Sequence, residues 1–130
     1  MAVLETTFLV DVLQNRHAAV ALLKEIENRE PLRFVAAPTV MELWEGTFLS
    51  NASEQERARV EALLASVAVL PLDTKSAKEA GEIAALLRKK GIPTQVHDIM
   101  IAGIARANGE TLITRDEHYA KIPGLKVLKY

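Results

Sequence analysis

The sequence predicts an α/β sandwich built around a mostly parallel central sheet of about five strands. Two observations support this prediction. Short apolar segments alternate with longer amphipathic ones along the whole chain, and no internal repeat, low-complexity tract or linker interrupts them. The chain has 130 residues, the length of one ordinary domain, so we expect a single domain over residues 1–130.

The first half of the chain is predicted to place two helices after each of two strands. Alanine, leucine, lysine and glutamate dominate the second helical segment, which Pro31 ends. Thr39 has the position of a helix N-cap, with Glu42 three residues later at the capping-box spacing. The predicted elements here are a strand at 1–4, helices at 8–13 and 17–28, a strand at 33–36, and helices at 39–49 and 53–65.

The second half is predicted to contain three more strands and two long helices. Asp73 is a candidate cap for the first of these helices, and Gly91 closes it. The next helix is largely apolar after Asp98, which lies near its start. The predicted elements are a strand at 67–70, helices at 75–90 and 95–108, a strand at 111–114, a short helical turn at 116–121 and a strand at 126–128.

Composition excludes several classes of protein. The chain has no cysteine, which excludes disulfide frameworks, thiolate nucleophiles and cysteine-ligated metal sites, and a reducing cytoplasm is the expected setting. No apolar run approaches the length of a membrane span, and no signal peptide precedes the first strand, so we expect no membrane partner. There is no glycine-rich phosphate loop or nucleophile elbow, and the three histidines lack zinc-ligand spacing.

Charge is distributed unevenly although the net charge is only −1. Residues 1–65 hold six Lys and Arg against ten Asp and Glu, whereas residues 66–130 hold ten against seven. A basic face in the second half would attract a phosphate backbone, but solvated helix surface explains the same imbalance. Charge alone therefore does not identify a nucleic-acid partner.

Four acidic residues stand at positions where a parallel sheet would bring them together. Glu5 ends the first strand and Asp116 follows the fourth, and the carboxyl ends of parallel strands share one edge. Glu42 and Asp98 lie near the starts of helices. Each also has a purely structural interpretation: Glu5, Asp98 and Asp116 as caps or turn residues, and Glu42 as the capping-box partner of Thr39.

Taken together, the acids favour a metal site over four separate caps. Crowded carboxylates repel one another unless their pKa values rise or a cation binds between them. Mg²⁺ prefers oxygen ligands, and such a site suits phosphodiester hydrolysis, because a bound metal lowers the pKa of an attacking water. Acids alone can thus serve a nuclease without cysteine or paired histidines. Asp11, another acid nearby, is expected at a solvated or capping position.

Five segments carry these acids in order along nearly the whole chain: Val3–Asp11, Thr39–Gly46, Asp98–Ala105, Leu112–Tyr119 and Ile122–Val127. In this order and spacing the chain resembles the PIN-domain family, and within it the VapBC-type toxin ribonucleases. The resemblance implies an α/β/α sandwich and a Mg²⁺- or Mn²⁺-dependent endoribonuclease that cleaves RNA. It also implies a homodimer held inactive by a cognate antitoxin protein.

The resemblance implies roles for particular residues. Glu42, Asp98 and Asp116 match acids of the family's site, Thr7 matches the hydroxyl residue two after the first acid, and Thr114 a supporting polar residue before the last. The family's first acid is nearly always Asp, whereas this chain has Glu5. We predict that Glu5, Glu42, Asp98 and Asp116 are catalytic, that Thr7 and Thr114 support them, and that Glu5, Asp98 and Asp116 bind the metal.

Two other functions remain open at this point. The longer side chain of Glu5 moves its carboxylate by about a bond length, which disturbs octahedral Mg²⁺ geometry. A catalytically silent PIN scaffold that binds RNA or a protein partner is therefore the alternative. A receiver-like phosphoacceptor domain also carries acids at strand ends, but it needs two adjacent acids after its first strand, which are absent. Phe8, Trp44 and Phe48 are expected to supply apolar surface for a symmetric interface.

Overall fold

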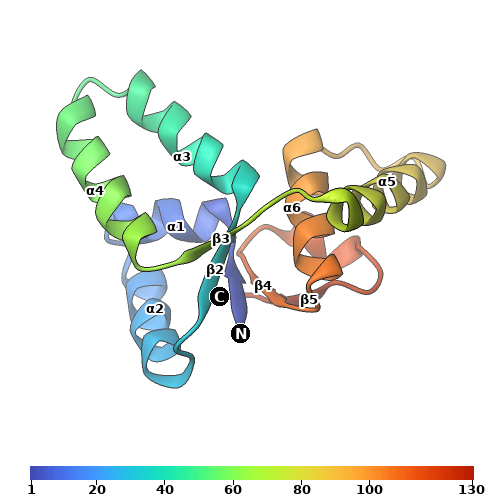
Figure 1. Ribbon diagram of the computed structural model, residues 1–130, viewed down its shortest axis with the longest axis horizontal. Coiled ribbons are helices and arrows are strands. Elements are labelled where there is room, and N and C mark those ends of the chain that lie inside the picture. Colours follow the sequence, from blue (N-terminus) through green and yellow to red (C-terminus); the bar gives the residue numbers. More distant parts are fainter.

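The computed structural model describes residues 1–130 and contains one five-stranded sheet in which every strand pair is parallel (Figure 1). The strand order is β3-β2-β1-β4-β5, so β1 lies at the centre. The strands are β1 (Ala2–Leu4), β2 (Arg33–Ala36), β3 (Ala68–Leu70), β4 (Thr111–Ile113) and β5 (Lys126–Leu128). The prediction of five strands in a parallel sheet is confirmed.

Six α-helices and one 3₁₀ helix connect the strands, close to the predicted positions. They are α1 (Thr6–Leu13), α2 (His17–Arg29), α3 (Ala37–Leu49), α4 (Ser53–Ala65), α5 (Thr74–Lys89), α6 (Val96–Ala107) and η1 (Glu117–Lys121). As predicted, Asp73 caps α5 by accepting a hydrogen bond from the backbone N–H of Ser76 at 2.8 Å.

The predicted start of α3 is wrong. The helix begins at Ala37, with Ala36 in the N-cap position and no side-chain cap, because Pro38 fits the first turn of a helix, where its missing N–H is not needed. Thr39 therefore lies inside the helix with its side chain fully buried, and it does not form a capping box with Glu42.

The sheet separates two apolar layers, since alternate strand residues point to opposite faces. Figure 1 shows the helices that cover the two sides of the sheet. On the central strand, Val3 packs with buried residues of α5, α6 and η1. Ala2 and Leu4 pack with residues of α1, α2, α3 and α4 on the other face. This is the predicted α/β/α sandwich.

The close packing of α5 on α6 fixes the helix that carries Asp98. Gly103 of α6 faces Ala80 of α5, and a Cβ added at Gly103 would lie 2.7 Å from the Cβ of Ala80. Glycine permits this approach because only it lacks a side chain there. The close approach of α6 to α5 thus depends on the absence of a side chain at Gly103.

Three chain segments converge at the carboxyl edge of the sheet. In the parallel register Leu4 pairs with Ile113, and the backbone N–H of Glu5 donates to the carbonyl of Ile113 at 3.1 Å. Glu5 and Thr114 consequently leave neighbouring strands side by side, next to the start of α3 after β2. Among the helices, none is long and apolar enough to cross a membrane.

Candidate active site

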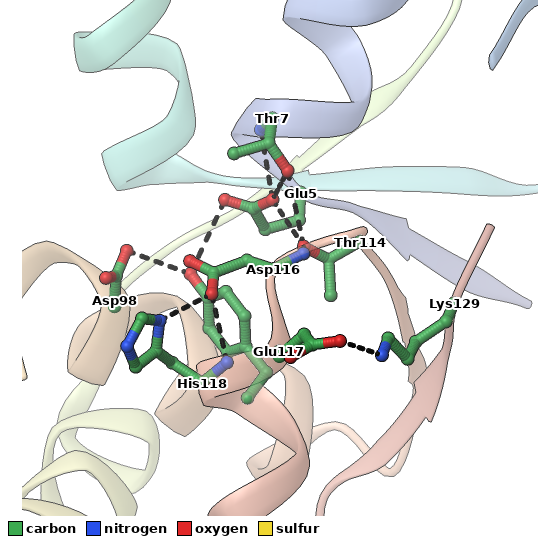
Figure 2. Close-up of polar contacts among 9 residues, drawn as sticks. Glu5, Thr7, Asp98, Thr114, Asp116, Glu117, His118 and Lys129 are labelled. Carbon is green, nitrogen blue, oxygen red and sulfur yellow. Dashed lines mark hydrogen bonds and ion pairs between the residues drawn. The ribbon is translucent and has the colours of Figure 1, made fainter.

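The carboxyl edge of the sheet contains a polar pocket of about 410 Å³. Its lining includes all four predicted acids and no hydrophobic residue; the only side chain there that could carry positive charge is His118. Figure 2 shows Glu5, Asp98 and Asp116 directed toward a common space. A more apolar cavity of about 460 Å³, lined partly by Ile26 and Leu128, contains none of these acids. The acidic pocket is therefore the candidate site.

Glu5 is both the N-cap of α1 and part of the pocket wall. Its side chain is 2% exposed, and its Oε2 accepts hydrogen bonds from the backbone N–H of Thr7 at 3.0 Å and from the Thr114 hydroxyl at 2.7 Å. The Thr7 hydroxyl also donates to Oε2. The capping interpretation of Glu5 is correct, and so is its placement in the acidic cluster.

Asp98 lies in the first turn of α6, where the N-cap is Gln95, so its interpretation as the helix cap is wrong. Its Oδ1 accepts a hydrogen bond from the hydroxyl of Tyr119 at 3.0 Å. The same hydroxyl lies 3.5 Å from Oε1 of Glu5. Tyr119 thus stands between two of the acids.

Asp116 is the N-cap of η1 and also faces the pocket (Figure 2). Its Oδ1 accepts the backbone N–H of His118 at 3.0 Å and lies 2.7 Å from Nδ1 of the same residue. Its own backbone N–H donates to the Thr114 hydroxyl at 3.0 Å. Thr114 therefore connects Asp116 to Glu5, the supporting position predicted for it.

Glu42 reaches the pocket from α3 through contacts with α1. Its Oε1 accepts the hydroxyl of Thr6 at 2.8 Å, and that hydroxyl also lies 3.0 Å from Oγ1 of buried Thr39. The structure thus brings together all four predicted acids and both predicted threonines, Thr7 and Thr114.

The four acids share one pattern. In each carboxylate, only one of the two oxygens accepts hydrogen bonds of 3.0 Å or less from the chain. Glu5 uses Oε2, Glu42 uses Oε1, and Asp98 and Asp116 use Oδ1. The second oxygen of each carboxylate remains without such a bond. No three acidic, histidine or cysteine side chains are arranged to surround one ion.

Burial and mutual repulsion raise the pKa values of the innermost acids. Burial raises the pKa of Glu5, against the hydrogen bonds from Thr7 and Thr114 that lower it. Burial also raises the pKa of Asp98, with a further increase from the negative charge of Asp116. Removing carboxylates from water disfavours their charged forms, and no lysine or arginine lines the pocket to compensate.

The prediction that Asp11 lies at a solvated or capping position is wrong. It is 2% exposed and accepts hydrogen bonds from Arg115 at 2.7 Å and from the hydroxyl of Tyr130 at 2.7 Å, with Arg16 at 3.2 Å. Asp11 therefore stabilises the fold outside the acidic pocket.

The prediction that Phe8 supplies interface surface is wrong. Phe8 is fully buried and packs edge-to-face on Tyr130, with the ring centroids 5.0 Å apart.

Thr6 and Tyr119 are the pocket contacts that sequence reasoning missed. Each directs a hydroxyl at the carboxylate of a predicted site residue, Thr6 at Glu42 and Tyr119 at Asp98. A weak signal for Tyr119 exists in the sequence, since it is a polar-tipped aromatic residue three positions after Asp116. His118 is exposed and contacts Asp116.

The fold and this pocket define a class of protein. A parallel α/β/α sandwich with acids gathered at one sheet edge is the arrangement that the resemblance to PIN domains implied. The sequence profile of the PIN domain matches residues 2–125, and the chain belongs to that family.

Relatives narrow the class to the VapC-type toxin ribonucleases. The tRNA(fMet)-specific endonuclease VapC of Salmonella typhimurium is 36% identical over 94 residues, 72% of this chain and 71% of that protein. A chain in the crystal structure of DNA-bound VapBC from Salmonella typhimurium superposes with a TM-score of 0.89 at 28% identity, covering 98% of this chain and 96% of that one. These matches confirm the resemblance to VapBC-type toxin ribonucleases.

A structure of VapBC2 from Rickettsia felis, bound to a DNA fragment from its promoter, extends the likeness of fold. It superposes with a TM-score of 0.92 at 21% identity, covering 99% of this chain and 98% of that chain. At this identity the match supports the fold alone. The whole architecture, from β1 to β5, is thus shared with solved toxin–antitoxin proteins.

Proposed function

We propose that this chain is a metal-dependent endoribonuclease, the toxin of a type II toxin–antitoxin module, and that it cleaves RNA at the acidic pocket. Glu5, Glu42, Asp98 and Asp116 are the catalytic acids of this proposal, with Thr7 and Thr114 in support. The observation that carries it is the gathering of four carboxylates, from four separate segments, in one pocket without lysine or arginine.

The residues of the pocket fit a hard divalent cation, Mg²⁺ or Mn²⁺. All candidate ligands are carboxylate oxygens, the donors that such ions prefer, and each acid keeps one oxygen without a close hydrogen bond from the chain. Mg²⁺ usually keeps several waters and binds only one or two carboxylates directly. A site in which three side chains do not converge on one point is compatible with this mode of coordination. Glu5, Asp98 and Asp116 are the proposed ligands, one or two of them bound directly and the rest through water that the ion keeps.

The chain's own groups prepare the pocket for a phosphodiester. When bound, the metal lowers the pKa of an attacking water and neutralises charge on the leaving oxygen. Thr7 and Thr114 hold Glu5 by one oxygen, and the backbone N–H and ring of His118 hold Asp116. Thr6 holds Glu42. These contacts fix the carboxylates before substrate arrives, which removes reorganisation from the reaction.

The proposed substrate is a structured RNA, with transfer RNA as the first to test. The Salmonella typhimurium and Shigella flexneri relatives are named as tRNA(fMet)-specific endonucleases.

The proposed protein partners are a cognate antitoxin and a second copy of this chain. Solved relatives include VapBC complexes of toxin with antitoxin. On this chain, α3 exposes Met41, Phe48 and Leu49, with Phe48 66% and Leu49 79% exposed. Apolar side chains gathered on one helix support burial against a protein partner.

One observation favours a second function, a silent scaffold that binds RNA or a protein. Glu5 replaces the family's usual Asp, and one of its oxygens is committed to the N-cap of α1. The two functions differ in whether Glu5 still contributes to metal-dependent cleavage.

Cleavage of transfer RNA and of a mixed RNA pool, with Mg²⁺ or Mn²⁺, tests the proposal. We expect the wild-type chain to cut, Asp116→Asn and Glu5→Ala to lose cleavage, and Glu5→Asp to retain or increase it. Cleavage by Glu5→Ala at the wild-type rate would place Glu5 outside the site. If only Glu5→Asp exceeds the Asp116→Asn background, the natural chain is a silenced nuclease, and if no variant cuts, the scaffold function is favoured.

A further inference from the structure

Tyr119 brings a hydroxyl from inside the core to two of the acids that line the pocket. Its side chain is 1% exposed and packs with the apolar residues of α5 and α6 beneath the sheet. Only the hydroxyl meets the acids, at 3.0 Å from Oδ1 of Asp98 and 3.5 Å from Oε1 of Glu5. A phenylalanine would fill the same core volume without touching either carboxylate.

The single proton of this hydroxyl distinguishes the two acids. A phenol donates one hydrogen bond, and the shorter distance assigns it to Asp98. The close donors around Glu5 all reach its other oxygen, Oε2. Oε1 of Glu5 and Oδ2 of Asp98 therefore accept no close hydrogen bond from the chain.

A tyrosine hydroxyl is uncharged at neutral pH and carries a proton that it can donate. The hydroxyl consequently adds no negative charge to a pocket that already holds four acids.

We propose that Tyr119 is a positioning residue for the metal site: its hydroxyl holds Asp98 by Oδ1 at a fixed separation from Glu5, which leaves Oδ2 of Asp98 and Oε1 of Glu5 for a divalent cation. This inference rests on the proposed function and assigns a role to a residue outside the four acids. Partners that orient metal ligands in this way change metal affinity by about 10-fold to 100-fold when they are removed.

Tyr130 provides a matched control within the same chain. Its hydroxyl donates to a buried carboxylate, Asp11, at 2.7 Å, and neither residue lines the acidic pocket. Tyr119→Phe and Tyr130→Phe thus each remove one tyrosine–carboxylate hydrogen bond, one in the pocket and one away from it.

The test is calorimetric titration of the metal-free chain with MnCl₂. We expect Tyr119→Phe to bind Mn²⁺ about tenfold more weakly than wild type and Tyr130→Phe to bind it with unchanged affinity. Thermal unfolding in EDTA verifies that both variants are folded. RNA cleavage provides a second measurement: Tyr119→Phe needs about tenfold more Mn²⁺ for half-maximal rate and reaches the wild-type rate at saturation, a shift that lost stability alone does not produce.

Two results would overturn the inference, and they differ. Equal Mn²⁺ affinity in wild type and Tyr119→Phe removes the role of the hydroxyl and leaves the proposed function intact. No Mn²⁺ binding by wild type at millimolar concentration, with Asp116→Asn as the reference, removes the metal site itself and this inference with it.

Discussion

Helix α1 carries a buried carboxylate near each end, and the chain surrounds the two in opposite ways. Glu5 at its start and Asp11 near its finish are each 2% exposed. Asp11 faces Arg115 and Arg16 together with a tyrosine hydroxyl, whereas Glu5 faces hydroxyls, one backbone N–H and other acids. Equal burial therefore accompanies opposite electrostatic surroundings.

The pKa values of the two groups follow these surroundings. Burial alone would raise the pKa of Asp11, but the hydrogen bonds from Arg115 and Tyr130 outweigh it and lower the pKa below the ordinary value. For Glu5 burial dominates, and the pKa is raised. The chain thus pairs Asp11 with arginines and leaves Glu5 without a cationic partner. An uncompensated buried charge marks a place where a ligand can supply the missing charge.

The largest expected effect concerns Asp11. Asp11→Asn keeps the size of the side chain but removes the charge that Arg115 and Tyr130 bind, so we expect unfolding free energy to fall by about 2–3 kcal/mol at pH 7. Urea unfolding measures it. Glu117→Gln is the control, because it breaks the surface contact with Lys129, where Glu117 is 81% exposed, and should leave the midpoint unchanged. A midpoint for Asp11→Asn equal to that of wild type would refute the structural role.

The second effect has the opposite sign. Glu5→Gln removes the uncompensated charge and keeps an oxygen for the contacts with Thr7 and Thr114, so without metal we expect the free energy of unfolding at pH 7 to rise by about 1 kcal/mol. Calorimetric unfolding in EDTA measures the change. With Mg²⁺ the difference in unfolding free energy between Glu5→Gln and wild type should become smaller or change sign. The reason is that a ligand bound to the folded state stabilises only the chain that binds it. Lower stability of Glu5→Gln in EDTA would mean that its capping role outweighs the cost of its charge.

A pH series separates the two acids further. Because the pKa of folded Glu5 is raised, its contribution is fully present below the unfolded value of about 4.3 and is lost as pH rises through the folded pKa. The advantage of metal-free Glu5→Gln over wild type, at most about 1 kcal/mol, should therefore disappear as pH falls from 7 to 4. The contribution of Asp11, with its lowered pKa, should persist to pH 4 and be lost only below it. Denaturant midpoints across this range provide the measurement.

The smallest effect distinguishes the two arginines around Asp11. Arg115 reaches both carboxylate oxygens, at 2.7 and 3.4 Å, whereas Arg16 makes one contact at 3.2 Å and is 64% exposed. We expect Arg16→Gln to lower the free energy of unfolding by less than about 0.5 kcal/mol and Arg115→Gln by about 1 kcal/mol. Matched urea titrations resolve the difference, and a reversed order would make Arg16 the dominant partner.

The fold, and the gathering of the four acids at one edge of the sheet, could be predicted from the sequence because both depend on local pattern. Strand and helix periods placed the elements, and strand ends brought Glu5 and Asp116 to one edge of a parallel sheet. The start of α3 was missed because Pro38 in a first turn competes with the capping box suggested at Thr39.

The partners of the acids could not be predicted from pattern. Asp11 meets Arg115 and Tyr130 across more than 100 positions of sequence, and Tyr119 meets Glu5 at a separation of 114. Such contacts depend on how side chains from distant elements pack. Local spacing predicts that an acid lies at the end of a strand or helix, but it does not predict which hydrogen-bond donor the acid meets.

The central position of β1 has a consequence for the time at which the site forms. During synthesis β1 emerges first, yet one of its two neighbours, β4, follows more than 100 residues later. Pairings over such sequence distances are slow to form, because the intervening loop must first be closed. A nascent chain therefore holds Glu5 without Thr114 or Asp116, and the proposed site stays incomplete until the last segments of the chain have emerged.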